Sequence, residues 1–351
     1  VFDNQMPHYK DALASLSIND RIVVISSSHA LSDGGYMVSA LSKCLDDFSS
    51  EKVNKNAPLY SSDGFKEECD EAEKKFDVKN MWPMDKLTMC KYDTNDAHLA
   101  PLGTQYIEKE HCMPVDQLAC YDKKAKKPVN LSDISCVGVS MSILALNQII
   151  NNVSFNYNEP LSITTILDIR RFTNNKSKIN WSYGNCIAQP TIKVDVSKND
   201  TIKDVAKKFR DYINFLKPHG VFYSAKHMKE LIKNKPPKAI IGCYSGVGPI
   251  VFKRPIVDFD LRDCIRLTPG TGDHGEGNGT LFGIISYSKV SEYRNDFYFV
   301  SRLWPSKTTL ERGEMLFESF KHFITKVPIN SKFDDTLKEL IDFQKSVKRI
   351  F

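Results

Sequence analysis

One short segment of the chain combines the residue types that acid–base chemistry needs. It reads His29-Ala-Leu-Ser-Asp33-Gly34. A histidine has a pKa near neutrality, so its imidazole can take a proton from a hydroxyl or an amine at cellular pH. Glycine lets the backbone turn sharply and lets a substrate come close. The segment therefore predicts a general base at His29. The alternative is a surface loop that holds these residues by chance.

The elements around this segment favour the catalytic interpretation. Residues 21–28 form a β-branched apolar run that predicts a buried strand. Residues 36–48 carry apolar side chains at helical spacing. A strand, a glycine-rich turn and a helix in this order would project His29 into a cleft. Asp33, four residues on, is expected to point away from that cleft and to hold the loop by a salt bridge.

Arg170 is the cation predicted to pair with Asp33. Residues 161–169 are predicted as a strand, and Asp168 and Arg170 would share one face at its end because strand side chains alternate with period 2. A buried carboxylate needs a cation, so the charged atoms of Asp33 and Arg170 are expected within about 4 Å of each other. A surface arginine that merely ends a strand is the alternative.

The rest of the chain mixes strands and helices without an internal repeat, which indicates an α/β or α+β protein, and we take α/β. Further strands are predicted at 104–112, 187–196 (interrupted at Pro190), 238–244, 281–288 and 296–303. Helices are predicted at 114–123, 134–150, 201–216, 309–327 and 334–348. The basic stretch 123–128 is typical of an exposed linker. We therefore predict two parts, 1–125 and 132–351, with a crossing at 126–131.

Composition excludes several classes of protein. The 351 residues are 41% hydrophobic and 26% charged, with a net charge of +5. These values are those of a globular protein and give no indication of nucleic-acid binding. No apolar run reaches the ~18 residues that a spanning helix needs. The nine cysteines are irregularly spaced, which predicts buried free thiols in a reducing compartment. The chain opens at Val1 and shows no secretory signal. We expect the cytoplasm, and the N-terminal segment expected to be missing leaves targeting to an organelle or a membrane surface open.

Together with three later segments, the first motif resembles the CoA-dependent acyltransferase superfamily. This group includes chloramphenicol acetyltransferase, the condensation domains of nonribosomal peptide synthetases and the alcohol acetyltransferases of fungi. Its active-site pattern is His-x-x-x-Asp-Gly, as at 29–34. Residues 167–171 (Leu-Asp-Ile-Arg-Arg) and 183–185 (Tyr-Gly-Asn) look like its Asp-x-Arg strand and Gly-Asn segment. Residues 244–248 (Tyr-Ser-Gly-Val-Gly) resemble its Ser-Asn-x-Gly stretch, with Gly246 in place of the Asn.

Departures from the other branches favour the alcohol acetyltransferases. Ser28 precedes His29, where condensation domains usually carry a second histidine. The late Asp-Phe-Gly-Trp-Gly of the plant acyltransferases has no match in this chain. In the family a longer segment precedes the motif than the 28 residues found here. The first part of the N-terminal subdomain is therefore expected to be missing.

The resemblance implies two chloramphenicol-acetyltransferase-like subdomains, each a mixed sheet flanked by helices, with an active-site tunnel between them. Acyl-CoA, expected as acetyl-CoA, would be the co-substrate, and a small alcohol or amine would be the acceptor. No metal, no permanently bound cofactor and no acyl-enzyme are expected. His29 would be catalytic, and the motif would be held by Asp33, Gly34 and Arg170. Asn185 and Ser245 are candidate oxyanion donors, and Tyr183 is a candidate for the acceptor tunnel.

The function predicted from the sequence is acyl-CoA-dependent O-acyl transfer, most similar to alcohol O-acetylation. The alternative is a non-catalytic binding or assembly protein that keeps the fold, since fold alone does not fix function. The intact His29 and Asp33 favour the enzyme, and the missing Asn at Gly246 favours the alternative.

Overall fold

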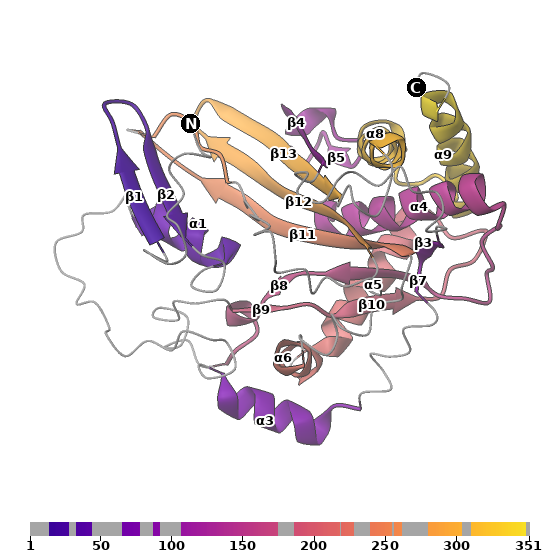
Figure 1. Cartoon of the computed structure of the whole chain (residues 1–351), viewed down its shortest axis with the longest axis horizontal. Coiled ribbons are helices and arrows are strands. Elements are labelled where there is room, and N and C mark those ends of the chain that lie inside the picture. Colours follow the sequence, from indigo (N-terminus) through magenta and orange to yellow (C-terminus); the bar gives the residue numbers. More distant parts are fainter. Residues whose placement is uncertain are drawn as a thin grey trace.

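A mixed sheet of seven described strands forms the centre of the protein (Figure 1). The computed structural model describes residues 14–27, 33–43, 65–77, 87–91, 107–174, 186–217, 219–227, 239–254, 256–261, 280–303 and 310–348. The strand order is β10-β7-β11-β12-β13-β4, and β3 also pairs with β11. β11 is parallel to β7 and β12, and the other pairings in the sheet are antiparallel. The strands are β3 (Met89–Lys91), β4 (Ile107–Pro114), β7 (Leu161–Thr165), β10 (Thr191–Val194), β11 (Ala239–Val251), β12 (Thr280–Ser291) and β13 (Arg294–Leu303).

Helix α4 (Leu131–Asn151) is the central helix of the core. It packs against β11, and α5 (Ile202–Leu216), α8 (Leu310–Lys326) and α9 (Phe333–Lys348) pack against it. Among the described residues, α4 is the one helix that is long and apolar enough to cross a membrane. However, 78% of its apolar 18-residue stretch is buried inside the fold. A helix that is apolar on nearly every face is typical of a protein core as well as of a membrane. These four helices confirm the predictions at 134–150, 201–216, 309–327 and 334–348.

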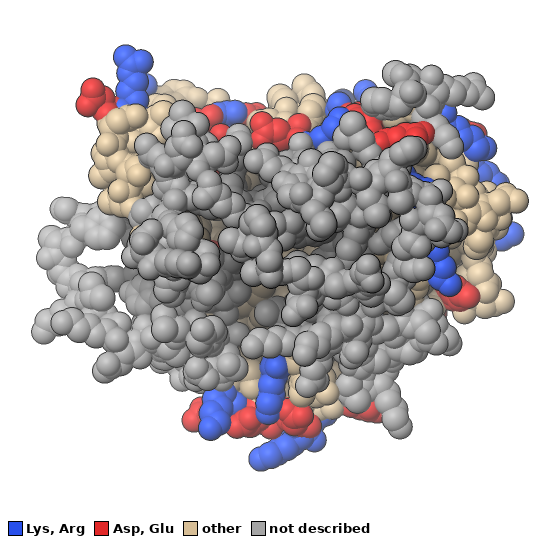
Figure 2. All heavy atoms as spheres, viewed as in Figure 1, with Lys and Arg blue, Asp and Glu red and all other residues tan. Residues whose placement is uncertain are grey.

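A second, smaller core lies below the sheet in Figure 1 and was not predicted. It joins α3 (Lys66–Lys75) and α6 (His219–Lys226) to the 3-10 turn η5 (Ile169–Arg171) and to β9 (Ile187–Ala188). α3 is almost entirely charged and buries only Cys69 and Ala72, so the sequence carries little apolar periodicity there. On the face shown in Figure 2, described charges of both signs mix at the lower edge, over α3. Lys75 pairs there with Glu71.

The predicted strand 21–28 is present but is not buried. β2 (Val23–Ser27) pairs with β1 (Ala14–Ile18) in an antiparallel ladder of two described strands. Val23 and Ile25 are exposed, as are Leu16 and Ile18 on β1. The prediction of burial is therefore wrong for the described residues. A β-branched run specifies a strand, but burial depends on what packs on that strand.

Two other predictions need correction. Residues 114–123 were predicted as a helix with Pro114 in its first turn. They form the single 3-10 turn η4 (Val115–Gln117) and then β5 (Tyr121–Asp122), with Pro114 as the residue before the turn. The last three strands are longer than predicted, because the sheet pairing continues through residues with small or charged side chains.

The basic stretch 123–128 lies in a tight hairpin. β5 pairs with β6 (Lys127–Pro128), and the lysines of the turn are exposed, as expected of a solvated run. Two strands that precede this stretch, β3 and β4, pair with β11 and β13. The central sheet therefore includes residues from both sides of the predicted crossing at 126–131, and the division into 1–125 and 132–351 stays a prediction.

Free thiols are found at each cysteine that the structure describes. Six of these are buried, and Cys112 is exposed. Burial raises the pKa of the Cys90 thiol to about 12, so this thiol is inert as a nucleophile. Cys44 and Cys264 lie outside the described residues.

Candidate active site

Asp33 begins helix α1 (Gly34–Lys43), the helix that follows the His29 motif. Its Oδ1 accepts a hydrogen bond from the backbone N–H of Tyr36 at 2.8 Å, and its carbonyl accepts from Met37 at 3.0 Å. This is the contact of an N-cap aspartate, which satisfies an N–H that the first turn of a helix leaves unpaired. Hydrogen bonds within the first turn of α1 therefore hold the motif aspartate, in addition to its contacts with distant residues.

The predicted ion pair between Asp33 and Arg170 is present. Nη1 of Arg170 lies 3.0 Å from each carboxylate oxygen of Asp33. Both side chains are buried, at 7% exposed for Arg170 and 1% for Asp33. The backbone N–H of Cys186 donates to Oδ2 of Asp33 at 2.6 Å. Donors from α1, η5 and residue 186 thus occupy both oxygens, which suits a carboxylate that holds segments together and not one that takes a proton from substrate.

Arg170 reaches this position from a turn and not from the predicted strand face. β7 ends at Thr165, β8 (Leu167–Asp168) pairs with β9, and η5 follows. Oδ1 of Asp168 accepts from the backbone N–H of Arg170 at 3.1 Å and from its Nη1 at 2.9 Å. A side chain that bonds the backbone two residues on favours a turn over an extended strand. The pairing was predicted correctly, but the period-2 argument for it was wrong.

Arg170 therefore pairs with two carboxylates, and Nε of the exposed Arg171 also lies 3.9 Å from Oδ2 of Asp168. Burial raises the pKa of Asp168, the Arg170 charge opposes that rise, and the Asp33 charge adds to it. Burial alone would lower the pKa of Arg170, but the carboxylates of Asp33 and Asp168 outweigh it and raise the pKa. Removing the guanidinium would leave the buried Asp33 charge next to the half-buried Asp168 charge, with only the exposed Arg171 near Asp168.

The close approach that glycine permits is made at Gly35. A Cβ at Gly35 would lie 2.6 Å from Oδ2 of Asp168 and 3.0 Å from Nη1 of Arg170. At Gly34, the motif glycine, the nearest atom would be Cγ2 of Val247 at 3.7 Å, an ordinary contact. Gly35 is thus the glycine that lets α1 pack closely against the charged side chains of Asp168 and Arg170.

We expect Gly35→Ala to lower the free energy of unfolding by about 1–3 kcal/mol, the usual cost of inserting a methyl group into packed atoms. Gly34→Ala is the matched control. Its Cβ has space, so its unfolding midpoint in urea should stay close to that of the unchanged protein. Equal midpoints for the two variants would contradict the assignment of the close contact to Gly35.

Residues 244–248 approach the same cluster from the sheet. Val247 is an extra residue in β11, because Gly246 pairs with Ser286 and Gly248 with Tyr287. This bulge has Gly248 at φ +93°, a conformation that glycine adopts readily. Nη2 of Arg171 donates to the Val247 carbonyl at 3.3 Å.

Ser245, a predicted oxyanion donor, lies on the sheet face that α1 shares. It pairs with Ile285 of β12, and Ile285 packs in one apolar cluster with Val247 and with Val38 of α1. Ser245 is half-buried. Its place next to the bulge is consistent with the predicted role, which stays a prediction.

Three of the predicted site residues, His29, Asn185 and Tyr183, lie outside the described residues, and so does the glycine-rich segment 268–279. Asp33, Gly34, Arg170 and Ser245 are described. The structure brings together residues from three segments of the resemblance, 29–34, 167–171 and 244–248, and adds the backbone N–H of Cys186. Sequence reasoning missed the contacts of Gly35 and of the Cys186 amide. The sequence signal available for Gly35 is a second glycine directly after Gly34. A backbone N–H donor such as that of Cys186 leaves no signal in the sequence.

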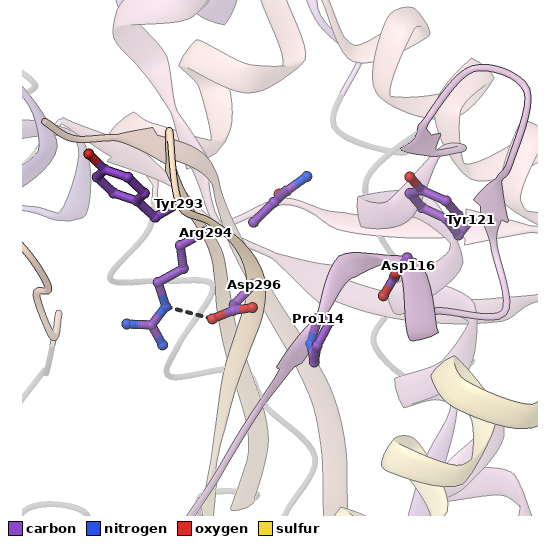
Figure 3. Close-up of a pocket in the computed structure, with 7 residues that line it drawn as sticks. Pro114, Asp116, Tyr121, Tyr293, Arg294 and Asp296 are labelled. Carbon is purple, nitrogen blue, oxygen red and sulfur yellow. Dashed lines mark hydrogen bonds and ion pairs between the residues drawn. The ribbon is translucent and has the colours of Figure 1, made fainter.

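A pocket of about 500 Å³ lies elsewhere, beside the turn from β12 to β13. Figure 3 shows Arg294 directed at Asp296, with Asp116 and Tyr121 on the opposite wall. None of the predicted site residues lines it. Over the described part of the chain, no group of three or more His, Cys, Asp or Glu side chains could hold a metal ion.

Comparison with solved structures identifies the fold. Polyketide synthase associated protein 5 from Mycobacterium tuberculosis aligns over 95% of this chain and 79% of its own, with a TM-score of 0.54 and 10% identity. The first condensation domain of the calcium-dependent antibiotic synthetase, in complex with a substrate analogue, aligns over 93% of this chain and 70% of its own, with a TM-score of 0.53 and 11% identity.

The chain has a condensation-domain fold. A starter condensation domain of rhizomide synthetase, solved with C8-CoA and Leu-SNAC, aligns over 87% of this chain and 65% of its own, with a TM-score of 0.50 and 8% identity. No protein-family model and no curated protein matches the sequence. The mixed sheet flanked by helices confirms the predicted α/β class.

Proposed function

We propose that the protein is an acyl-CoA-dependent O-acyltransferase. The observation that carries the proposal is the buried Asp33–Arg170 ion pair, which joins the aspartate of the His29 motif to the later segment 167–171, beside the backbone N–H of Cys186. The condensation-domain fold supports an acyltransferase in general. The acceptor class, an alcohol, and the donor, acetyl-CoA, come from the sequence resemblance.

In this proposal His29 takes the proton of the acceptor hydroxyl. The hydroxyl oxygen attacks the thioester carbonyl carbon, and the negative charge moves to the carbonyl oxygen. When the carbonyl reforms, the carbon–sulfur bond breaks, and the leaving thiolate takes the proton back from His29. The products are an ester and free CoA, with no acyl-enzyme. A hydrogen-bond donor to the oxyanion, for which Ser245 and Asn185 are candidates, is worth ~3 kcal/mol in comparable sites.

The alternative is a binding or assembly protein that keeps the fold without the chemistry. Gly246 favours this alternative, because the resemblance places an asparagine there. The architecture does not decide between the two, since one fold can serve several functions. We keep the cytoplasm as the proposed compartment.

Incubation with acetyl-CoA and a panel of alcohols and amines tests the proposal. We expect free thiol to appear with at least one alcohol, at a rate proportional to enzyme concentration, together with an equal amount of ester. Amines in the panel decide whether transfer to nitrogen also occurs. The binding alternative would be supported if CoA binds, as measured by calorimetry, while no acceptor releases thiol.

A further inference from the structure

A short segment after β11 lies on the central sheet without belonging to it. Residues 256–261, which we call the strap, have no regular secondary structure, and no described strand pairs with them. Phe259 of the strap stacks on Tyr287 of β12, with 5.6 Å between the ring centres. The N–H of Leu261 donates to the Tyr287 hydroxyl at 3.2 Å. Among the described residues, side chains of the strap and the sheet therefore hold the two together, and a strand ladder does not.

Lys289 of β12 is buried under the strap. Only 4% of its side chain is exposed, and its Nζ donates to Oδ1 of Asp258 at 3.0 Å and to Oδ1 of Asp260 at 2.8 Å. Nζ also lies 5.5 Å from the centre of the Phe259 ring and 5.6 Å from that of Tyr298. Two carboxylates and one ring around this buried charge thus come from the strap. A buried charge is tolerated only while its partners stay in place.

Two other charged groups near Lys289 pair with each other. Asp296 lies opposite Lys289 on β13, and its Oδ2 accepts from Nε of Arg294 at 2.6 Å (Figure 3). Nη1 of Arg294 also lies 2.8 Å from Oδ1 of Asp258. Burial alone would raise the pKa of Asp258, but hydrogen bonds from Lys289 and Arg294 outweigh it and lower the pKa. Asp258 is therefore ionised at neutral pH, and its charge is available to Lys289.

The strap covers the sheet face that the candidate active site shares. Phe259 and Leu261 belong to one apolar cluster with Val38 of α1 and with Val247 of the bulge. Ser245 lies on this face as well, paired with a β12 residue of the same cluster. Lifting the strap would take two side chains out of the cluster and open this face to solvent.

We propose that the strap opens as a unit over the candidate active site, and that Lys289 is the anchor that holds it closed. Opening breaks no described ladder, and the Asp258 and Asp260 side chains are already 50% and 42% exposed, so the cost of opening is well below that of unfolding. Closure is specific, because the closed strap supplies the carboxylates that the buried Lys289 needs. The motion takes no substrate, so it does not depend on the proposed acyl transfer.

Hydrogen exchange of the Leu261 amide, measured by NMR on the full chain at increasing urea concentrations, tests the opening. This N–H donates across the contact between strap and sheet, so lifting the strap frees it. We expect its exchange to depend only weakly on urea, because a local opening exposes little surface. The amide of Phe299, a fully buried residue of β13, is the control and should follow global unfolding. The same free energy and the same urea dependence at both amides would overturn the proposal.

Neutralising the strap tests the anchor. Asp258→Asn together with Asp260→Asn keeps the shape of both side chains, but the closed strap then buries the Lys289 charge beside neutral groups. We expect exchange at Leu261 to become at least about tenfold faster, since a buried charge without its partner is strongly unfavourable. Unchanged exchange at Leu261 in this double variant would show that the ion pairs do not hold the strap.

A third substitution gives the reverse effect. Adding Lys289→Met to the double variant removes the buried charge and keeps an apolar chain between the rings, so exchange at Leu261 should return to within about threefold of its original rate. Lys109→Met in the same background is the matched control. Lys109 pairs with Glu314 of α8, so its loss should restore nothing.

The outcomes for the anchor and for the opening are separate from those for acyl transfer. Recovery with Lys289→Met and none with Lys109→Met supports Lys289 as the anchor, whereas no recovery, or equal recovery with both, overturns it. If the double variant does not fold, the urea dependence at Leu261 in the unchanged protein still decides whether the strap opens. Absence of thiol release with every acceptor would overturn the proposed function and leave these results valid.

Discussion

Replacing His29 with alanine is expected to lower kcat by about 10²- to 10⁴-fold, the range found when a general base is lost. An alcohol is a poor nucleophile until its proton is removed, and alanine cannot accept that proton. The Kd of CoA should stay within about twofold, since the base acts on the acceptor and removing it takes away no contact to CoA. Thiol release under saturating acetyl-CoA and acceptor measures the first quantity, and calorimetry measures the second.

His322→Ala is a matched control for the loss of a histidine. His322 lies on α8, stacks on Phe343 and bonds Glu339 of α9. Figure 1 shows α8 and α9 well away from α1. Its loss should leave kcat unchanged. Full activity in the His29→Ala variant would refute the proposed mechanism, and loss of CoA binding in that variant would show that His29 acts on the donor.

The central helices and strands could be predicted because their sequences contain the signal that determines them. The helix at 201–216 begins at Thr201, which forms a reciprocal capping box with Asp204, and its apolar residues recur at helical spacing. β1, α3 and α6 lack such a signal. α6 is eight residues long, and its stability comes from packing against α3 and Leu216 and not from propensity.

In the candidate site, too, some features could be predicted from the sequence and others could not. The ion pair between Asp33 and Arg170 could be predicted, because a motif carboxylate that is buried must find a cation. The turn at η5 could not, since it is held by local hydrogen bonds, from the Arg170 N–H to Asp168 and from the Phe172 N–H to the Ile169 carbonyl, and by the distant carbonyl of Cys186. The end of the pairing between β7 and β11 at Tyr244 is also a property of tertiary structure. Nothing in the residues 245–251 says that β7 ends beside Tyr244 while β12 continues.

Arg170→Ala is expected to destabilise the protein by about 3–5 kcal/mol, the cost of leaving a buried charge without its partner. Nη1 of Arg170 contacts both Asp33 and Asp168, so the buried Asp33 loses its cation and Asp168 keeps only the exposed Arg171 at 3.9 Å. Asp33→Asn should cost less. Its side-chain oxygen can still accept from Tyr36 or Cys186, and Arg170 keeps Asp168 as a partner.

The double variant separates the ion pair from independent effects. With Asp33 neutral, losing the guanidinium leaves no buried charge, only the half-buried Asp168 carboxylate, so the double variant should be less destabilised than the sum of the single variants. Urea unfolding of the four proteins at one pH gives this interaction energy directly. Asp168→Asn with Arg170→Ala forms a parallel cycle, and it should also show a smaller loss than the sum. Strict additivity in the Asp33 cycle would mean that Asp33 is held by the backbone donors of α1 and Cys186 alone, with Arg170 serving Asp168.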